Sequence, residues 1–358
     1  MDKDIKKVLV IGASGFIGGR LVEKLILDHQ HIPKCLYRNY GKLSRIARFN
    51  VDLVHGDILF PENYEKDIAD CDIFVFCVHG KGKDIELNWK INTIGLENML
   101  KIAVKNKIKQ FIFLSTTAIY EEGQNQGEFN EKNIPNIIKK DYAGGKIKGE
   151  ELCKKYSKRY GLKITILRPT IVYGPFAPSF TIYPAELIKS GALKDYGFFT
   201  GLCNPIYVDD VVNSIVFTFL NKDAINETFI ISSGETIEWL KFYNYFSVAI
   251  SGKKLSQENF MAYKLKATPL RLLKTILKSL VGFAPDLAKS VYGFIKSKGS
   301  GDWTWVKGVD VSTLKPNFYK KRLVFRTDKM KNRLMYIPEY TFEKGFEITK
   351  EWLKHQGY

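Results

Sequence analysis

The stretch KVLVIGASGFIG, from Lys7 to Gly18, decides the fold. Lys7–Ile11 is a short run rich in β-branched residues, which predicts a buried strand. Phe16–Leu27 carries apolar residues at helical spacing, and a glycine-rich turn joins the two segments. Such a turn lets the backbone approach a pyrophosphate, which the unpaired N–H groups and the dipole of the helix N-terminus then hold. We therefore expect a dinucleotide to bind at Gly12, Ser14, Gly15, Phe16, Ile17 and Gly18.

Short apolar runs and helical stretches continue to alternate beyond this segment. Strands are predicted at Cys35–Tyr37, Asp52–His55, Asp72–Val78, Gln110–Ser115 and Lys163–Leu167, and helices at Leu87–Asn106 and Tyr142–Tyr160. Strands that alternate with helices of this length form βαβ units, with helices on both faces of a parallel sheet. The predicted fold is therefore α/β, a Rossmann-type doubly wound parallel sheet. After Pro169 the pattern is interrupted by prolines, and Ile206–Leu220 predicts a further short strand followed by a helix.

The composition is that of an ordinary folded protein, with 358 residues of which 45% are hydrophobic and 26% charged. This excludes a disordered or collagen-like chain. No apolar run approaches the roughly 18 residues of a membrane-spanning helix, and Met1–Lys7 is too short and too charged for a signal peptide. Five cysteines without a CxxC pair indicate neither a disulfide framework nor a zinc site, so no metal is expected. The sequence predicts a cytoplasmic protein.

Positive charge is concentrated near the end of the chain. Of a net charge of +17, Lys253–Arg333 contributes +14, with 19 basic and 5 acidic residues. This polarisation suggests an anionic partner, such as a phosphorylated substrate or a membrane surface, or else a solvated face in a lysine-rich chain. Pro269–Val281 predicts a basic amphipathic helix. The basic amphipathic segment Pro269–Lys298 either lies on an anionic membrane or, as we prefer, packs against the substrate lobe over the pocket. No nucleic-acid-binding module is recognisable, so no nucleic acid partner is expected.

The end of the second predicted strand indicates which dinucleotide binds. An acidic residue at this position accepts a hydrogen bond from the ribose of NAD, whereas arginine suits the 2′-phosphate of NADP. Because Tyr37-Arg38-Asn39 contains no acid, Arg38 favours NADP, with NAD as the alternative. Asp57 follows the third strand, where it can either accept a hydrogen bond from the adenine amino group or cap the next helix.

Tyr142 and Lys146 are four residues apart and so share one face of a predicted helix. A free phenol has a pKa of about 10 and is a poor base at neutral pH. A nearby ammonium group and a positive nicotinamide ring favour the phenolate, which can then exchange a proton with a substrate hydroxyl. Ser115 and Thr116 end the fifth strand, where ligands bind in doubly wound sheets, and a hydroxyl there can hold the substrate oxygen.

Together these motifs resemble the extended short-chain dehydrogenase/reductase family, also called the NAD-dependent epimerase/dehydratase family. The resemblance covers nearly the whole chain and rests on Gly12–Gly18, the Asp57 turn, Asn92-x-x-Gly95, STTAIY (Ser115–Tyr120), Tyr142–Lys146, Glu150, LRPTIVYGP (Leu167–Pro175), YVDD (Tyr207–Asp210) and the tail Glu339–Trp352. It implies that Thr116 orients the substrate, that Tyr142 is the acid/base, and that Lys146 assists it and binds the nicotinamide ribose. The further dinucleotide-binding residues expected are Arg38, Asp57, Ile58, Val78, Asn92, Ser115, Tyr142, Lys146 and Pro169.

The resemblance also implies a domain organisation. Residues 1–175, about 205–236 and the C-terminal tail would form the dinucleotide-binding Rossmann domain. About 176–204 and 237–333 would form a smaller, discontinuous substrate lobe that contains the basic amphipathic helices. Members of this family are frequently homodimers.

Departures from the family pattern bear on the substrate. Thr117 and Ala118 stand where dehydratases carry an Asp-Glu pair, so elimination of water is disfavoured. The leading expectation is an NAD(P)-dependent oxidoreductase or epimerase that interconverts a secondary alcohol and a ketone on a nucleotide sugar or related carbohydrate. Ile171 and Cys203 replace residues typical of nucleotide-sugar epimerases and favour the alternative, a hydroxysteroid-dehydrogenase-like enzyme for a lipidic alcohol, conceivably at the inner membrane face. A non-catalytic dinucleotide sensor is the third alternative.

Overall fold

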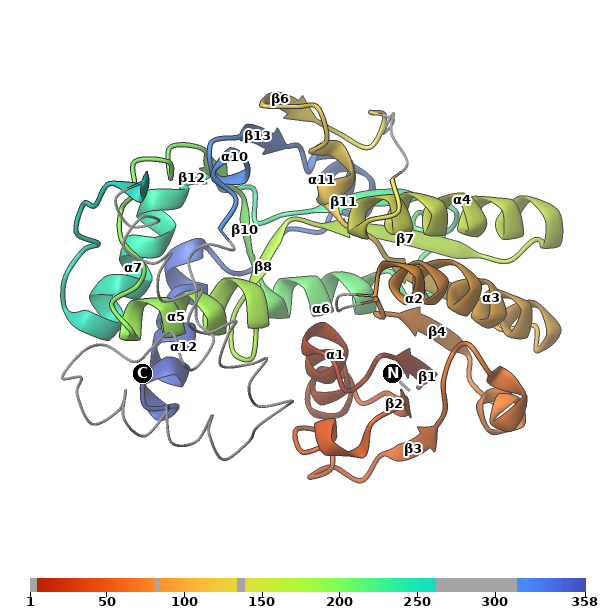
Figure 1. Cartoon of the computed structure of the whole chain (residues 1–358). Helices are drawn as coiled ribbons and strands as arrows, with labels where there is room; N and C mark the ends of the chain where they lie inside the picture. The colour runs from red at the N-terminus through yellow and green to blue at the C-terminus, as the bar shows by residue number, and fades with distance from the viewer. Residues whose placement is uncertain (1–4, 81–83, 134–138, 262–313) are drawn as a thin grey trace, which may run out of the picture. The chain divides into compact units, whose positions relative to one another are not determined.

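The computed structural model describes residues 5–80, 84–133, 139–261 and 314–358 (Figure 1). The chain divides into two compact units. The first comprises Met1–Ala177, Asn204–Thr236 and Leu323–Gly345, and the second comprises Pro178–Cys203, Ile237–Arg322 and Phe346–Tyr358. The amphipathic helix predicted at Pro269–Val281 lies outside the described residues.

The first unit is built on a parallel sheet of seven strands in the order β11-β7-β5-β4-β1-β2-β3. These strands are β1 (Lys7–Ile11), β2 (Ile32–Tyr37), β3 (Asp52–His55), β4 (Ile73–Phe76), β5 (Gln110–Leu114), β7 (Ile164–Pro169) and β11 (Thr228–Ile231). The arrangement confirms the predicted Rossmann-type α/β fold. The chain leaves β1 toward β2 on one side and returns to β4 on the other, and in such sheets ligands bind beyond the carboxyl ends of the strands at this switch point.

Helices cover both faces of this sheet (Figure 1). The helices of the first unit are α1 (Phe16–Leu27), α2 (Ile85–Lys90), α3 (Leu96–Lys105), α4 (Tyr142–Tyr160), α6 (Val208–Phe217) and α11 (Asp328–Leu334), with short strands β6 (Gln126–Phe129), β8 (Ile171–Tyr173), β10 (Pro205–Tyr207) and β13 (Arg322–Phe325). Val8 and Val10 of β1 belong to the core formed with α1 and α6, whereas Leu9 and Ile11 belong to the core formed with α3 and α4. Because successive side chains of a strand point to opposite faces, a continuous apolar run requires cover on both sides.

The helix predicted over Leu87–Asn106 is interrupted in the structure. It forms α2, a π-helical turn at Ile91–Gly95, and α3. Inside the turn, Asn92 Nδ2 donates to the carbonyl of Asn88 at 2.9 Å and Thr93 Oγ1 donates to that of Trp89 at 2.8 Å. Side chains that hydrogen-bond to carbonyls of the preceding turn compete with the regular backbone ladder and deform a helix. The prediction of helical structure over this window is confirmed, but apolar spacing does not reveal the π-helical turn inside it.

The second unit contains a cluster of aromatic side chains between short elements. These elements are a π-helical turn at Pro178–Ile182, α5 (Tyr183–Lys189), β9 (Leu202–Cys203), β12 (Ile237–Glu238), α7 (Trp239–Ser251) and α10 (Pro316–Tyr319). Strands β9 and β12 pair antiparallel. Trp239, Tyr243 and Phe199 pack around Tyr319, and the Tyr243 hydroxyl donates to the Tyr319 hydroxyl at 3.0 Å. The helix α12 (Phe342–His355) begins in the first unit and ends in the second.

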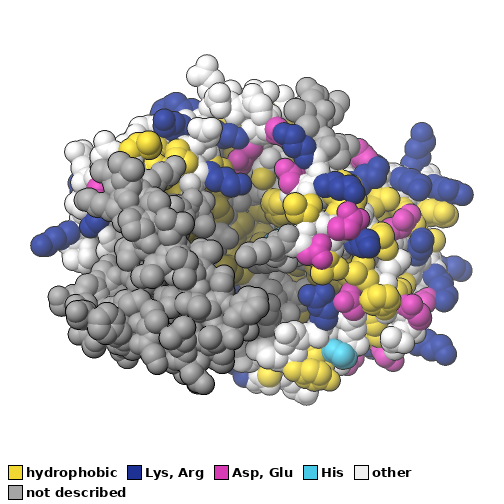
Figure 2. Space-filling view, in the orientation of Figure 1, with side chains coloured by type: hydrophobic (Ala, Val, Ile, Leu, Met, Phe, Trp, Pro, Cys, Tyr) yellow, Lys and Arg dark blue, Asp and Glu magenta, His cyan; other side chains and the backbone are white. Residues whose placement is uncertain are grey.

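Surface charge in the described ranges is largely mixed. On the face shown in Figure 2, Lys and Arg side chains lie among Asp and Glu side chains. Several exposed charged residues of the described ranges form ion pairs, such as Lys148 with Glu151 at 2.8 Å and Lys140 with Glu86 at 3.1 Å. A search of the described residues found no helix with the length and hydropathy needed to cross a bilayer.

The C-terminal tail is held by a buried carboxylate of the first unit. Asp210, fully buried at the start of α6, accepts hydrogen bonds from the backbone N–H groups of Glu339 at 2.7 Å and Tyr340 at 3.1 Å. Its own carbonyl accepts a hydrogen bond from the Tyr336 hydroxyl at 3.0 Å. The three partner residues lie within Leu323–Gly345, which groups with the first unit, whereas Phe346–Tyr358 groups with the second. The sequence had assigned the whole tail to the first domain and the chain up to residue 333 to the lobe.

Burial raises the pKa of Asp210 to about 6, although the two backbone N–H groups act in the opposite direction. Because this pKa lies above the unfolded value of about 3.9, the stability that the protonated form provides is present below pH 4 and lost as the pH rises through 6. We expect the free energy of unfolding of the wild type, relative to Asp210→Asn, to fall by about 2 kcal/mol between pH 4 and 7. Urea unfolding at several pH values measures this, with Asp223→Asn, at an exposed position, as the control. A difference independent of pH would contradict the expectation.

Candidate active site

The glycine-rich turn between β1 and α1 is too tight for side chains at two of its positions. Gly12 has φ +97°, and a Cβ there would lie 2.9 Å from Val78 Cγ2. A Cβ on Gly18 would lie 2.3 Å from the carbonyl oxygen of Gly12, which is backbone and cannot move aside. The Gly15 N–H closes the turn by donating to the same carbonyl at 2.9 Å. The turn thus brings the first turn of α1 directly against the end of β1.

The N-terminus of α1 is suited to an anion. Gly15 is its N-cap residue, no side chain of the described residues caps it, and its first turn contains no acid. The first N–H groups of a helix need an acceptor from outside the helix, and its dipole favours negative charge there. Ser14, Gly15, Phe16 and Ile17 line this turn and are not buried. The residues present therefore fit the diphosphate of a dinucleotide.

Two residues predicted to recognise the adenosine half lie next to each other. Arg38 follows β2 with 62% of its side chain exposed, and its guanidinium contacts the Asp57 carboxylate at 3.4 Å. Asp57 Oδ1 also accepts a hydrogen bond from the Leu59 N–H at 3.0 Å, which closes a local turn. The next helical turn, Pro61–Asn63, begins after Phe60 and has no side-chain cap among the described residues, so the structure does not give Asp57 the capping role that the sequence left open. Ile58 is buried, and it packs so closely against Gly95 that a Cβ on this glycine would lie 2.5 Å from Ile58 Cδ1. The side chain of Ile58 therefore belongs to the core.

The three predicted catalytic residues come together beyond the carboxyl end of β5. Thr116 follows this strand, and its side chain hydrogen-bonds with that of Tyr142, the first residue of α4. Lys146, one turn further along α4, is only 3% exposed and donates to the carbonyls of Leu114 at 2.7 Å and Val78 at 3.1 Å. Its ammonium group is thereby fixed between the ends of β4 and β5.

The surroundings of Tyr142 set its acid/base properties in the protein alone. Burial raises the pKa of the Tyr142 hydroxyl, and the hydrogen bond with Thr116 lowers it by less. The sequence predicted that Lys146 and a positive nicotinamide ring together favour the phenolate, and this joint effect stays a prediction. In the structure the lysine is directed at two backbone carbonyls, and burial lowers its own pKa to about 8. Tyr142 as a whole residue is 43% exposed, and its ring packs edge-on against His79, at 5.4 Å between centroids.

The remaining predicted cofactor residues have varied surroundings. Val78 lies against Gly12, as described above, and contributes its carbonyl to Lys146. Asn92 is buried beside Gly145, and its Oδ1 has no hydrogen-bond partner among the described residues. Such an acceptor is usually satisfied by water or a ligand. The Pro169 carbonyl accepts a hydrogen bond from Thr117 Oγ1 at 3.3 Å.

Ser115 belongs to a buried network beneath the catalytic residues. Its hydroxyl donates to Glu150 Oε1 at 2.6 Å, and Arg168 Nε donates to the same oxygen at 2.8 Å. A second guanidinium nitrogen of Arg168 pairs with Glu150 Oε2, and a third contacts the Tyr120 hydroxyl. The network joins α4 to the end of β5 and to β7. It therefore fixes the positions of Thr116 and Tyr142 relative to each other. The sequence showed Glu150 and Arg168 as parts of two motifs but gave no sign that they form a pair.

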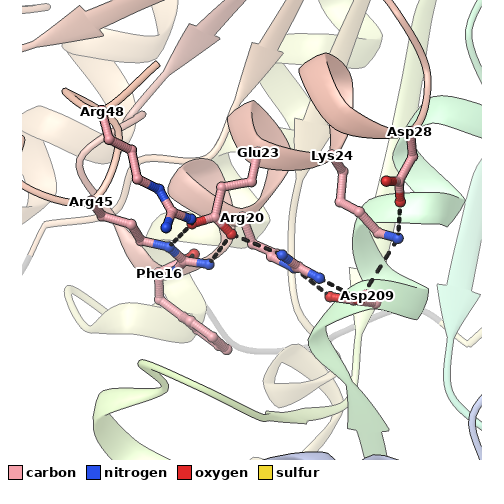
Figure 3. Close-up of polar contacts among 8 residues, drawn as sticks. All are labelled: Phe16, Arg20, Glu23, Lys24, Asp28, Arg45, Arg48 and Asp209. Carbon is pink, nitrogen blue, oxygen red and sulfur yellow. Dashed lines mark hydrogen bonds and ion pairs between the residues drawn. The ribbon is translucent and has the colours of Figure 1, made fainter. Parts of the chain in front are cut away.

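A second polar network supports the dinucleotide turn, and the sequence analysis missed it (Figure 3). Arg20, Arg45 and Arg48 converge on Glu23 of α1, with contacts of 2.9, 2.7 and 3.2 Å. Arg20 also donates to both oxygens of Asp209 in α6, at 2.6 and 2.7 Å. Burial would raise the pKa of Glu23, but hydrogen bonds from Arg45 and Arg20 outweigh it and lower the pKa. The i, i+3 spacing of Arg20 and Glu23 was the one local signal for this network.

Comparison with known proteins identifies the family. The sequence model of the NAD dependent epimerase/dehydratase family matches residues 8–232. The chain belongs to this family. Membership confirms the resemblance seen in the sequence, the enzyme class and the use of a nicotinamide dinucleotide.

Individual members of the family are only distantly similar. A UDP-glucose 4-epimerase of Vibrio cholerae is 25% identical over 253 residues, which are 68% of this chain and 76% of that protein. A decarboxylating sterol-4-alpha-carboxylate 3-dehydrogenase of Candida albicans is 27% identical over 194 residues, 49% of this chain and 53% of that one. The structure of a UDP-glucuronic acid 4-epimerase of Bacillus cereus, in complex with UDP-glucuronic acid and NAD, superposes with a TM-score of 0.73 at 21% identity and covers 98% of this chain and 100% of that chain. This last likeness supports the fold.

The Glu150–Arg168 pair allows a test of how the site is held in this epimerase/dehydratase family member. Glu150→Gln should lower the free energy of unfolding by about 3 kcal/mol, because it leaves a buried guanidinium without its counter-charge. Glu151→Gln is the matched control, since Glu151 is a neighbouring exposed acid paired with Lys148, and such surface pairs contribute about 0.5 kcal/mol. Urea unfolding of the three proteins measures both values. Equal effects of the two substitutions would show that the buried pair does not support the site.

Proposed function

We propose that this protein interconverts a secondary alcohol and a ketone by hydride transfer, with a nucleotide sugar or related carbohydrate as substrate and NADP as the preferred cofactor. The observation that carries the proposal is the convergence of Thr116, Tyr142 and Lys146 beyond β5, beside a helix N-terminus that fits a diphosphate. We further propose that the second unit, which begins at Pro178 and is discontinuous in sequence, binds the substrate.

This chain's own residues would hold the substrate and move its proton. A bound nicotinamide would supply hydride acceptor and donor chemistry for the interconversion of the alcohol and the ketone. Thr116 would hold the substrate oxygen, and Tyr142 would take the hydroxyl proton as the carbonyl forms and give it back in the reverse direction. Lys146 would keep a positive charge near the phenol and bind the ribose. Burial raises the pKa of Tyr142, so the chain by itself favours the protonated phenol at neutral pH.

A lipidic alcohol is the second candidate substrate. The similarity to the sterol dehydrogenase of Candida albicans and the presence of Ile171 and Cys203 support it. A sugar epimerase would turn over without added cofactor, because the hydride returns to the product. A reductase for a lipidic ketone would instead consume one NADPH per turnover. A homodimer, a cytoplasmic location and contact of the basic segment with a membrane stay predictions.

Tyr142→Phe tests the catalytic role. We expect turnover to fall at least about 100-fold, since this residue supplies general acid–base catalysis, while the dissociation constants for NADP⁺ and NAD⁺ change little. Epimerisation of UDP-sugars followed by chromatography, and NADPH oxidation with ketone substrates, measure turnover. Tyr160→Phe, at the exposed end of the same helix, is the control. Full activity of Tyr142→Phe in both assays would exclude the mechanism.

Arg38→Ala tests the proposed cofactor preference. Removing the guanidinium should weaken NADP⁺ binding about 10-fold or more and leave NAD⁺ binding nearly unchanged, because only NADP⁺ carries the 2′-phosphate. Isothermal titration calorimetry with each dinucleotide gives the ratio. Arg159→Ala, which removes the same charge from the C-terminal turn of α4, should change neither value. Equal weakening of both dinucleotides would place Arg38 away from the 2′ position.

A further inference from the structure

Arg45 makes contacts that tie together three parts of the first unit. Its Nε and one terminal nitrogen donate to the two oxygens of Glu23 at 2.8 and 2.7 Å. The other terminal nitrogen donates to the carbonyl of Phe16, the first residue of α1, at 3.3 Å. The guanidinium carbon also lies 4.3 Å from the centre of the Phe176 ring. Figure 3 shows Arg45 beside Phe16 and Glu23.

The backbone around Arg45 makes room for these contacts. Its side chain crosses α1 at Gly19, where a Cβ would lie 3.4 Å from Arg45 Cδ and 3.3 Å from the carbonyl of Ala13. On the other side, Phe176 has φ +67°, a conformation that a bulky side chain rarely adopts. Strained residues of this kind persist where the surrounding structure determines them, and they cluster at functional sites. Here the strain places the aromatic ring over the guanidinium.

We propose that Arg45 is a positioning residue for the dinucleotide, which fixes the first turn of α1 and couples it to the Phe176 segment. This inference rests on the proposed function, because it assumes that the turn binds the diphosphate. The N–H groups of the first turn bind an anion best when their directions are fixed beforehand. Arg45 holds that turn from outside through the Phe16 carbonyl, and Glu23 balances its charge. Phe176, immediately before the end of the first unit, in turn limits where Arg45 can lie.

Arg48 provides a matched control for Arg45. It also contacts Glu23, at 3.2 Å, and its guanidinium also lies over an aromatic ring, that of Phe49 at 4.8 Å. Within the part of the chain that the structure describes, it makes no hydrogen bond to the first turn of α1, and it is largely exposed. In Arg45→Met, Glu23 keeps Arg20 and Arg48 as partners, so no buried carboxylate is left alone. The two substitutions therefore differ mainly in the contacts to Phe16 and Phe176.

The test measures binding of NADP⁺ and NAD⁺ to the full chain by isothermal titration calorimetry. Arg45→Met should raise both dissociation constants about 10-fold, the usual effect of losing a charged hydrogen bond, while Arg48→Met leaves them within about 2-fold of the wild type. At saturating dinucleotide, kcat of Arg45→Met should stay within about 2-fold of the wild type. Amide hydrogen exchange of the Gly19 N–H, which closes the first turn of α1 by donating to the Gly15 carbonyl at 2.9 Å, should be faster in Arg45→Met than in Arg48→Met. If Arg45 had a purely structural role, Arg45→Met would lower the free energy of unfolding, but its dissociation constants for the dinucleotides would not differ from those of Arg48→Met.

A double-mutant cycle tests the coupling to Phe176. Phe176→Leu alone should weaken dinucleotide binding about 3-fold, and Arg45→Met combined with Phe176→Leu should bind no more weakly than Arg45→Met. If Arg45→Met does not fold, Phe176→Leu carries the test, since it leaves every Glu23 contact in place.

Two results would overturn the inference: dissociation constants of Arg45→Met equal to those of the wild type, or equal weakening by Arg48→Met. Additive effects of Arg45→Met and Phe176→Leu on the dissociation constants would show that Arg45 and Phe176 are not coupled. A wild-type protein that binds neither dinucleotide would overturn the proposed function as well, so the two failures are distinguishable.

Discussion

The close approach of Gly18 to the carbonyl of Gly12 is the constraint on which the rest of the first unit depends. It sets α1 against the end of β1 with no side chain between them. The uncapped N-terminus of α1 consequently lies at the switch point of the sheet, where β1 is flanked by β2 and β4. A Cβ on Gly18 would push the helix away from β1, and the helix N–H groups would then no longer lie against this edge of the sheet. The remaining polar contacts hold α1 in the position that the two glycines permit.

Two adjacent carboxylates of the YVDD motif have different tasks in holding this arrangement. Asp209 binds the side chains of Arg20 and Lys24 and so ties α6 to α1. Asp210 binds backbone N–H groups of the tail and ties the same helix to Glu339 and Tyr340. Neighbouring residues of a helix point in directions about 100° apart, so one short motif can reach two segments that are distant in sequence. The motif thus acts as a support for the dinucleotide helix, although neither residue belongs to the predicted catalytic group.

Prediction from sequence succeeded where the signal was local. The bounds of β1 and α1 agree with the expectation, because an apolar run followed by a glycine turn and an amphipathic helix is a self-contained pattern. Prediction failed where the deciding contacts are distant. The π-helical turn at Ile91–Gly95 breaks no apolar periodicity, and the pairs Glu150–Arg168 and Glu23–Arg45 join residues 18 and 22 positions apart. The direction of the Tyr142 pKa shift also depends on burial, which helical spacing to Lys146 does not reveal.

The sequence by itself determined the fold class, the glycine turn and the Tyr142–Lys146 spacing, because each follows from the steric and periodic properties of adjacent residues. Only the tertiary structure decided which distant residues contact the functional side chains. It directed Lys146 at two strand-end carbonyls, brought three arginines to one glutamate, and placed Arg38 against Asp57. These contacts depend on strand order and on helix packing across the sheet, where residues meet whose sequence separation carries no signal.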